Sequence, residues 1–431
     1  MKSLRLLPVL ITVVVLAAPA AGAVSRPKVL VIDFDNDVNP VTAGYATDAL
    51  DRAERDGYSA AVIRLDTPGG LSESMREIYQ KELALKIPVI VYVPTGARAA
   101  SAGVWIGQAA DVLAMAPQSN LGSSTPISSG GGNIPSDLKR KVINDAAKSL
   151  RALAEEHGRN GDWAEQAVRV ASNLTAREAL DRNVIDAISP TLPALLNKVD
   201  GQKTKPKNIT LHTADADVTE VKMSLWKRIL DTVIDPNIVV LLMSLGLLGI
   251  TIELYSPGLV LPGTVGITSL VLGLFGLQVL PTSWAGILLM LLAFGFFVAD
   301  LFVPTHGVLT VSGAIAFVLG ALVLFDPAGP LYDVSVWVAV AIAGTIALLM
   351  AGALTKVVQA RRRPAEVGAQ SIVGTTATSR YGGQVFANGE LWRARAVDGS
   401  ELEPGEAVEV VGVDDALTLE VRPLREPVGS P

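Results

Sequence analysis

The sequence of 431 residues contains no cysteine and only three histidines, His157, His212 and His306. Without cysteine, a thiol nucleophile, a thiolate metal site and disulfide bonds are excluded. None of the histidines has an acidic partner at a spacing typical of a catalytic pair, so each is interpreted as structural. His157, for example, ends a charged helix, where a histidine interacts favourably with the last carbonyl groups. Any nucleophilic chemistry in this chain therefore needs a base other than histidine.

A surplus of basic residues and of aromatic residues is also lacking. The 36 Lys and Arg against 42 Asp and Glu give a net charge of −6, and only 5% of residues are aromatic. This balance argues against nucleic-acid binding, which needs a basic footprint. We expect no cofactor and no metal. Asp33, Asp35 and Asp37 alternate near the end of a predicted strand, but no matching glutamate follows them, and they are interpreted as a solvated loop.

Half of the residues are hydrophobic, and the mean hydropathy is +0.41, which is too high for an ordinary soluble enzyme. Near the N-terminus, Lys2 and Arg5 precede an apolar run from Leu6 to Ala18. Ala21-Gly22-Ala23 then forms a small-residue cleavage site, a pattern typical of a cleaved secretory signal. An uncleaved N-terminal anchor is the alternative. The predicted parts of the chain are a signal peptide at 1–23, a first soluble domain at 24–200, a linker with an amphipathic helix at 201–237, a membrane domain at 238–355 and a β-rich domain at 368–425.

The first soluble domain alternates apolar strands with amphipathic helices. This alternation predicts an α/β fold with a largely parallel sheet that is covered by helices. Strands are expected at 29–32, 60–65, 89–93 and 111–115. Helices are expected at 42–56, 71–85 and 102–109, followed by a lysine-bearing helix and two more.

The membrane domain is predicted as an α-helical, multi-span unit. Each of its apolar segments is about long enough to span the ~30 Å hydrocarbon core of a bilayer. The five segments are 238–254, 259–280, 284–302, 308–325 and 334–355. Arg361, Arg362 and Arg363 follow the last segment, and the positive-inside tendency places them in the cytoplasm. An exported first domain and a cytoplasmic end require an odd number of spans, so we expect about five.

The tail at 368–425 alternates apolar and polar residues between turns that contain Gly and Asp. Five short strands in a segment of this length predict a small all-β barrel of the OB type. Because the tail has no basic surplus and few aromatics for base stacking, a protein-interaction role is favoured over nucleic-acid binding.

One serine lies in a stretch of very small residues. Ser101 sits in the octapeptide GARAASAG at 96–103, directly after the apolar run IPVIVYV at 87–93. A serine at a strand-to-helix turn among Ala and Gly leaves its hydroxyl uncovered. Upstream, a second predicted strand runs into DTPGG at 66–70, where a tight turn offers bare N–H groups suited to an oxyanion hole. Together these motifs predict a serine hydrolase; close helix packing and an ordinary Pro-Gly loop are the alternatives.

A lysine remains as the candidate base. It can serve only if burial lowers its pKa so that a neutral amine is available. Lys139 and Lys141 lie at the start of the predicted helix that ends near His157. A helical wheel places Lys139 on the apolar face and Lys141 opposite it. A solvated basic turn would explain both lysines without any catalytic role.

The chain resembles the NfeD family of membrane-bound, ClpP-class serine proteases. The motifs that carry the resemblance are DTPGG at 66–70, AASAG at 99–103, KVIND at 141–145, GRN at 158–160 followed by WAE at 163–165, LTAREAL at 174–180 with VID at 184–186, and GELWRA at 389–394. The resemblance implies a ClpP/crotonase-like fold for the first domain and Lys141 as the base. It also implies an oxyanion hole formed by the backbone N–H groups of Gly70 and Ala102. A helix at an oligomer interface can be buried on both faces, so the wheel does not decide between the two lysines.

The same resemblance implies an apolar peptide substrate, such as a segment of a stomatin-like membrane protein. We expect a homodimer or a higher homo-oligomer in the cell membrane, with the protease domain outside the cytoplasm and the barrel inside. Two other functions remain open. One is a catalytically inactive scaffold for a stomatin-like partner. The other is a crotonase-like acyl-CoA enzyme, which would not usually be exported and for which no adenine-binding feature is evident.

Overall fold

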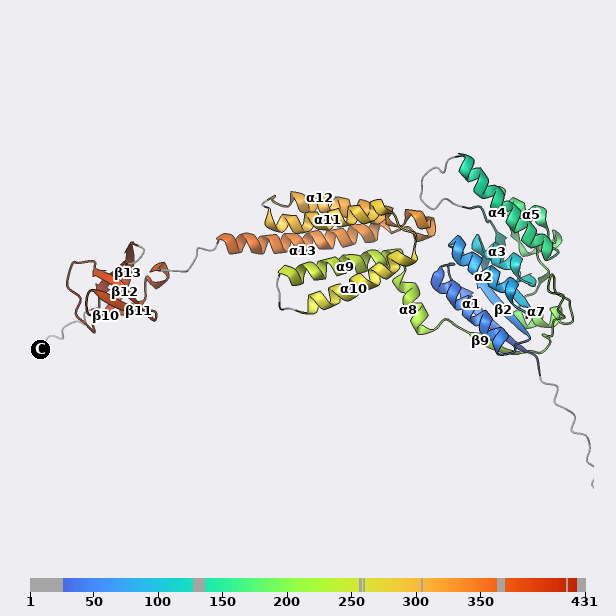
Figure 1. The fold of residues 1–431 in the computed structure, drawn as a ribbon, viewed down its shortest axis with the longest axis horizontal. Helices are drawn as coiled ribbons and strands as arrows, with labels where there is room; N and C mark the ends of the chain where they lie inside the picture. The colour runs from blue at the N-terminus through green and yellow to red at the C-terminus, as the bar shows by residue number, and fades with distance from the viewer. Residues whose placement is uncertain are drawn as a thin grey trace, which may run out of the picture. The chain divides into compact units, whose positions relative to one another are not determined.

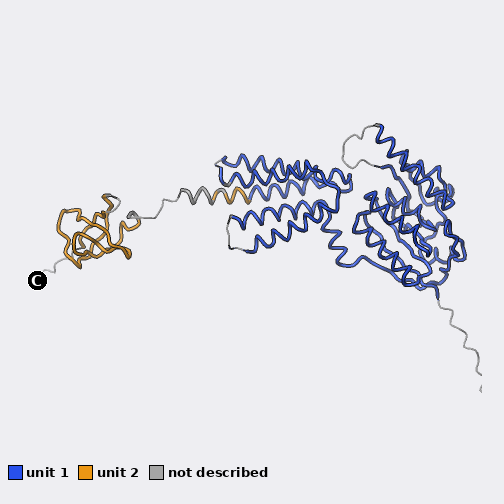
Figure 2. Tube along the Cα trace, in the orientation of Figure 1, with its two compact units in different colours: residues 1–348 blue, residues 349–431 orange. Residues whose placement is uncertain are grey.

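The computed structural model describes residues 26–126, 136–255, 258, 260–303, 305–362, 369–415 and 418–424. The predicted signal peptide at 1–23 and the side chains of Arg361 to Arg363 lie outside these residues. The chain divides into two compact units, Met1–Leu348 and Leu349–Pro431, which Figure 2 draws in different colours.

A parallel sheet forms the centre of the soluble part of the first unit (Figure 1). Its strand order is β8-β5-β3-β2-β1-β9, and every neighbouring pair is parallel. The strands are β1 (Lys28–Asp35), β2 (Ala60–Asp66), β3 (Val89–Val93), β5 (Val112–Met115), β8 (Ala187–Ile188) and β9 (Asp217–Val221). All four strands expected from apolar runs are confirmed. Such runs are typical of a parallel sheet, because both of its faces are buried.

Helices cover both faces of this sheet. Alternate side chains of β1 show the division: Leu30 and Ile32 pack in a core under α1 to α6, whereas Val29 and Val31 pack in a second core under α7. The helices are α1 (Pro40–Arg55), α2 (Ser72–Ala84), α3 (Ala102–Ala109), α4 (Ser136–Glu156), α5 (Gly161–Arg169), α6 (Ala176–Asp181) and α7 (Leu192–Val199). The α/β prediction is therefore confirmed.

A second, small sheet lies beside the turn that carries Ser101. It contains β4 (Arg98–Ala99), β6 (Asn120–Gly122) and β7 (Asn173–Thr175), with β4 and β6 parallel and β6 and β7 antiparallel. The sequence did not predict these strands. Each has only two or three residues, too few for a periodic pattern.

The polar stretch interpreted as a linker, 201–237, differs from that expectation in its first half. β9 lies within it and pairs with β1, and Leu211 is buried in the second core. β9 is an edge strand whose side chains are mostly exposed, so it lacks the apolar run that marks an inner strand. The expected amphipathic helix is present as α8 (Leu225–Val233), with Leu225, Trp226 and Ile229 exposed.

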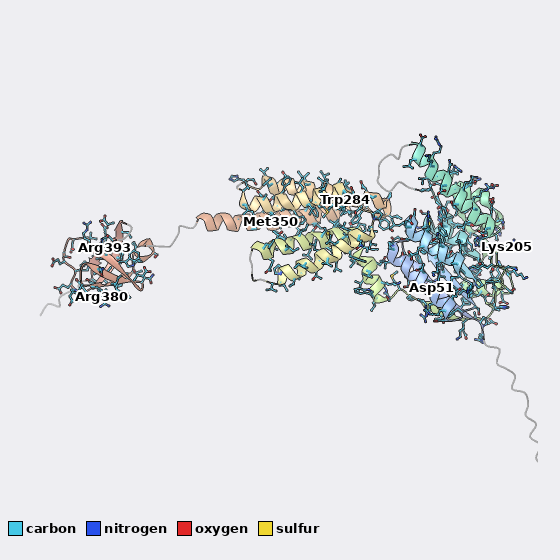
Figure 3. The ribbon with its side chains drawn as sticks, in the orientation of Figure 1. Asp51, Lys205, Trp284, Met350, Arg380 and Arg393 are labelled. Carbon is cyan, nitrogen blue, oxygen red and sulfur yellow. The ribbon has the colours of Figure 1, made fainter. Side chains whose placement is uncertain are left out.

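Five apolar helices follow α8 and run side by side (Figure 1). They are α9 (Pro236–Tyr255), α10 (Leu261–Val279), α11 (Trp284–Phe302), α12 (Val308–Leu324) and α13 (Val336–Arg362). Among the described residues, four stretches are long and apolar enough to cross a membrane: Pro236–Leu254, Leu261–Val279, Val308–Ala328 and Pro330–Ala353. The stretch Trp284–Asp300 of α11 is apolar but shorter, so a fifth span stays a prediction. Trp284, which Figure 3 labels, lies at the start of this stretch and is exposed.

Glycines bring these helices together in antiparallel pairs. A Cβ on Gly266 of α10 would lie 2.8 Å from the backbone nitrogen of Ile250 in α9, and one on Gly320 of α12 would lie 2.9 Å from that of Met290 in α11. Small residues allow such close approach of helices in membranes. The buried carboxylate of Asp300 adds a polar link, because it accepts hydrogen bonds from the Thr310 backbone and hydroxyl groups.

The second unit contains a closed barrel of five strands in the order β10-β11-β12-β14-β13. The strands are β10 (Thr376–Arg380), β11 (Gln384–Ala387), β12 (Glu390–Ala396), β13 (Ala407–Asp415) and β14 (Thr418–Pro423), preceded by the 3₁₀ turn η3 (Ala369–Ile372). β12 and β14 pair in parallel and the other neighbours are antiparallel. The predicted small barrel is confirmed, and its strand order is consistent with the OB type.

Candidate active site

Ser101 occupies a strained turn between β4 and α3. Its backbone has φ 51° and ψ −109°, and Ser101 is the N-cap residue of α3. A positive φ costs a residue other than glycine about 1–3 kcal/mol and persists only where the surroundings impose it. The Ser101 N–H donates to the Ser123 carbonyl at 2.6 Å, and the Ser124 hydroxyl donates to the Ser101 carbonyl at 3.1 Å. These bonds fix the serine on both sides of its α-carbon.

The turn at 66–70 lies directly against this serine. A Cβ on Gly69 would lie 2.5 Å from the Ser101 Cβ and 3.0 Å from its Oγ, and φ of Gly69 is +119°. A Cβ on Gly70 would overlap the Val38 carbonyl. Val38 holds the turn, because its N–H donates to the Gly69 carbonyl and its carbonyl accepts from the Leu71 N–H, both at 2.7 Å. Only glycine allows so close an approach.

Two backbone N–H groups beside Ser101 are unpaired. Within the ranges that the structure describes, the N–H groups of Gly70 and Ala102 have no acceptor. Ala102 is the first residue of α3, where a helix leaves its N–H groups without internal partners and carries a partial positive charge. Such groups can stabilise a developing oxyanion.

Gly70, Ser101 and Ala102 line one cleft of about 470 Å³. The structure therefore brings these three predicted site residues together. Most of the other side chains that line the cleft are apolar, and Tyr79 stacks on Trp105 with ring centroids 6.0 Å apart. The apolar side chains from α2, α3 and α4 are Met75, Tyr79, Trp105, Val142 and Ala146. A further wall comes from the membrane domain, namely Val279 at the end of α10 and residues 327–332 between α12 and α13.

The two candidate bases lie on α4, and both side chains are exposed. Lys139 and Lys141 have no hydrogen bond or ion pair with any other described residue, and neither lines the cleft. The α4 side chains that do line it are Val142, Asp145, Ala146 and Ser149. A single chain thus places Lys141 one residue before the cleft lining but outside it.

The C-terminal half of α4 is firmly held, in contrast to its start. Glu165 of α5 forms ion pairs with Lys148 at 2.6 Å and with Arg151 and Arg169 at 3.2 Å. These contacts, that of Lys148 first, lower the pKa of Glu165 to about 2. Leu138 and Val142, four residues apart near the start of α4, remain exposed.

The histidines lie away from the cleft, as expected for structural residues. His157 is buried with its Nδ1 2.8 Å from the Leu153 carbonyl oxygen, and burial lowers its pKa. His212 and His306 do not line the cleft either. Within the described ranges, no three His, Asp or Glu side chains converge as a metal-binding group.

A buried charged cluster beneath α2 was not recognised in the sequence. The Lys207 ammonium donates to the Asp111 carboxylate at 2.7 Å and to the Glu82 backbone carbonyl at 2.8 Å. The Glu82 carboxylate has no hydrogen-bond partner among the described residues, and burial raises its pKa well above the usual value. None of the three lines the cleft, so the cluster belongs to the core of the domain.

Three family models match the chain in succession. Residues 28–185 match the N-terminal domain of NfeD1b, residues 237–356 match the NfeD integral membrane domain, and residues 367–423 match the NfeD-like C-terminal, partner-binding domain. The three matches cover the α/β domain, the apolar helices and the barrel.

Two curated relatives match over most of their length. The chain is 33% identical over 441 residues to the membrane-bound protease PH1510 of Pyrococcus horikoshii, covering 97% of this chain and 98% of that protein. It is 28% identical over 356 residues to the membrane protein NfeD1b of Bacillus subtilis, covering 77% and 74%. A solved structure of 1510-N, a membrane-bound stomatin-specific protease, shows a lysine-to-alanine mutant with a substrate peptide; it is 32% identical, covers 48% of this chain and 98% of that one, and has a TM-score of 0.45. The chain therefore belongs to the NfeD family, and the relative that it matches over nearly its whole length is a membrane-bound protease.

Proposed function

We propose that this chain is a membrane-anchored serine endopeptidase with a dyad of Ser101 and Lys141. The observation that carries the proposal is the strained turn of Ser101, set between the unpaired N–H groups of Gly70 and Ala102 in an apolar cleft. The identity of 33% to a membrane-bound protease over 97% of the chain supports it.

In this mechanism the Ser101 Oγ attacks the scissile carbonyl carbon while its proton passes to the neutral Lys141 amine. The oxyanion that forms accepts hydrogen bonds from the Gly70 and Ala102 N–H groups. Collapse of the intermediate breaks the peptide bond, and the leaving amine takes the proton from Lys141. A water molecule then hydrolyses the acyl-enzyme by the same route, and Ser101 regains its proton.

The lysine can act as a base only when it is covered, because burial favours the neutral amine. In the single chain the start of α4 is open, with Leu138 52% and Val142 42% exposed. We assign the missing cover to the expected homodimer or higher homo-oligomer, in which these apolar side chains and Lys141 become buried together. The proposal thus requires association of the chain for full activity.

The substrate that suits the cleft is an apolar peptide segment. Met75, Tyr79 and Trp105 would contact the side chains of such a segment, and the unpaired N–H groups would meet the carbonyl to be attacked. The family resemblance adds a stomatin-like membrane protein as the substrate or the partner that presents it.

Replacement of the nucleophile tests the proposal. In full-length protein purified in detergent, a fluorophosphonate probe should label Ser101, and an apolar peptide should be cleaved. Ser101→Ala should abolish both, because the attacking oxygen is lost, while its thermal unfolding should stay close to that of the parent. Cleavage that persists in Ser101→Ala would exclude the dyad.

A scaffold without catalysis is the second candidate, and the barrel provides an observation in its favour. Tyr381 and Leu391 are 84% and 60% exposed on the barrel, which matches a partner-binding family model. The scaffold would be established by two results together. The parent protein would be neither labelled by the probe nor active on the peptide, and it would bind a stomatin-like protein as tightly as Ser101→Ala does.

A further inference from the structure

The segment between α12 and α13 belongs to the membrane domain by sequence but lies against the protease cleft. It contains two 3₁₀ turns, η1 (Asp326–Ala328) and η2 (Pro330–Tyr332). The Ala328 N–H donates to the Phe325 carbonyl at 2.8 Å and the Tyr332 N–H to the Gly329 carbonyl at 2.9 Å. Two prolines restrict the backbone further. The segment is therefore a defined element rather than a loose connection.

Tyr332 anchors this segment to the α/β domain. The residue is only 5% exposed, and its hydroxyl donates to the Asp37 carboxylate at 2.6 Å. Asp37 adjoins Val38, whose backbone holds the Gly69–Gly70 turn against Ser101. Thus a continuous set of contacts leads from the membrane domain to the proposed oxyanion hole.

The membrane side holds the segment at its other end. The Ser335 N–H donates to the Asn237 side-chain oxygen at 2.8 Å, which ties the start of α13 to the start of α9. A second connection passes through α8, where the Asp231 carboxylate accepts from the Asn39 side chain at 2.8 Å. The wall of the cleft is thereby fixed with respect to both the helices and the sheet.

Leu331 is an exposed apolar side chain of this segment. Phe325, Tyr332 and Val334 are buried, whereas Leu331 is 54% exposed and lines the Ser101 cleft. An apolar side chain that is exposed in a cleft beside a nucleophile can become buried against the substrate when the substrate binds. Met75 and Trp105, which line the same cleft, offer further apolar contacts.

We propose, on the basis of the proposed function, that residues 327–332 form a specificity-determining wall that selects an apolar peptide segment adjoining a membrane span. Leu331 contacts an apolar side chain of that segment, and Tyr332 positions the wall through Asp37. The wall connects α12 to α13, and Val279 ends α10, so a segment that leaves the bilayer beside these helices would reach the cleft. Selection thus depends on contacts that the membrane domain supplies.

The test measures binding without chemistry. In full-length Ser101→Ala protein in detergent micelles, fluorescence anisotropy gives the Kd of a labelled peptide rich in Val, Leu and Ile, and of a matched peptide with Ser and Thr at those positions. Adding Leu331→Ser should raise the Kd of the apolar peptide roughly tenfold, because the buried contact is lost. The Kd of the polar peptide should change far less.

Two further variants make the result specific. Val170→Ser removes another exposed apolar side chain, outside the cleft, and should leave both Kd values unchanged. Tyr332→Phe keeps the ring but loses the bond to Asp37, and it should weaken binding of the apolar peptide by about threefold. Faster amide hydrogen exchange at 329–332 in Tyr332→Phe would show the loosened wall directly.

The inference would be overturned if Leu331→Ser left the Kd of the apolar peptide unchanged, or raised the Kd of both peptides equally. Tighter binding of the apolar peptide in Leu331→Ser would also overturn it, because the segment would then obstruct the cleft. So would a protein with Leu331 intact that binds no apolar peptide. Failure of the proposed function looks different. In that case the chain with Ser101 intact binds the apolar peptide with the expected dependence on Leu331 but does not cleave it.

Discussion

Two exposed lysines on α4, Lys139 and Lys141, are the candidates for the general base of the proposed dyad. We expect Lys141→Ala to lower the rate of peptide cleavage by about 10²–10⁴-fold, the usual contribution of a positioned base. Lys139→Ala, a matched loss of charge two residues away, should change the rate little. Cleavage assays on the full-length protein, with fluorophosphonate labelling as a second readout, would measure both. The opposite ranking would move the base to Lys139, as the helical wheel favours.

The buried Glu82 makes stability depend on pH. Burial raises its pKa in the folded chain, and Asp111 adds to this, whereas Lys207 and Arg159 oppose it. Between the ordinary pKa of a glutamate and this raised value, the folded state binds more protons than the unfolded state. The contribution of Glu82 to the free energy of unfolding is therefore largest below that pH window and falls as the pH rises through it.

Glu82→Gln tests this dependence because the amide has nearly the same shape but does not titrate. Thermal unfolding of the full-length protein, followed from mildly acidic to mildly alkaline pH, should show a decline in the parent that is reduced in Glu82→Gln. Parallel profiles for the two proteins would mean that the Glu82 carboxyl does not titrate across that range.

At the scale of elements, glycine contacts decide how the apolar helices pack. Gly266→Ala would place a Cβ 2.8 Å from the Ile250 backbone nitrogen and should destabilise the α9–α10 pair by about 1–3 kcal/mol. Gly295→Ala in α11 meets nothing within 4 Å and should be neutral or slightly stabilising. Scanning fluorimetry in detergent would compare the two. Equal melting temperatures would show that α9 and α10 do not need this close approach.

The elements that the sequence predicted are those whose pattern is local. β2 and β3 are continuous apolar runs, and α3 begins and ends as expected because small residues and the Ser101 turn mark its start. β9 was not predicted, because an exposed edge strand has no apolar run. β4 was not predicted either, because a strand of two residues shows no alternation of apolar and polar residues, although it holds the turn of the proposed nucleophile.

At the scale of the whole molecule, the site depends on contacts that no local pattern records. The Ser101 turn was predicted because consecutive residues carry it. Tyr332 and Asp37 are 295 positions apart, and their hydrogen bond follows only from the fold. For the same reason Asp37, interpreted as part of a solvated loop, holds a wall of the cleft. The role of Lys141 as the base stays a prediction, because no residue in the described part of one chain buries its side chain.

The pairing of the helices bears on the predicted membrane topology. α11 has 19 residues, a length of about 28 Å at 1.5 Å per residue, close to the ~30 Å core of a bilayer. It packs antiparallel to α12, since Gly286 near its start meets Leu324 at the end of α12. If α12 spans the membrane, α11 has to cross it as well, which favours five spans over four.

Five spans would place the protease domain and the barrel on opposite sides of the membrane, and the absence of cysteine from the sequence permits a direct test of this prediction. Val170→Cys and Tyr381→Cys each add one thiol at a site that is 71% and 84% exposed, in the protease domain and the barrel respectively. In intact cells, a membrane-impermeant maleimide should label Val170→Cys at once and Tyr381→Cys only after permeabilisation. Labelling of both from outside would require an even number of spans. The barrel would then share a compartment with the Ser101 cleft and could hand substrate to it, whereas opposite sides restrict the barrel to partners in the cytoplasm.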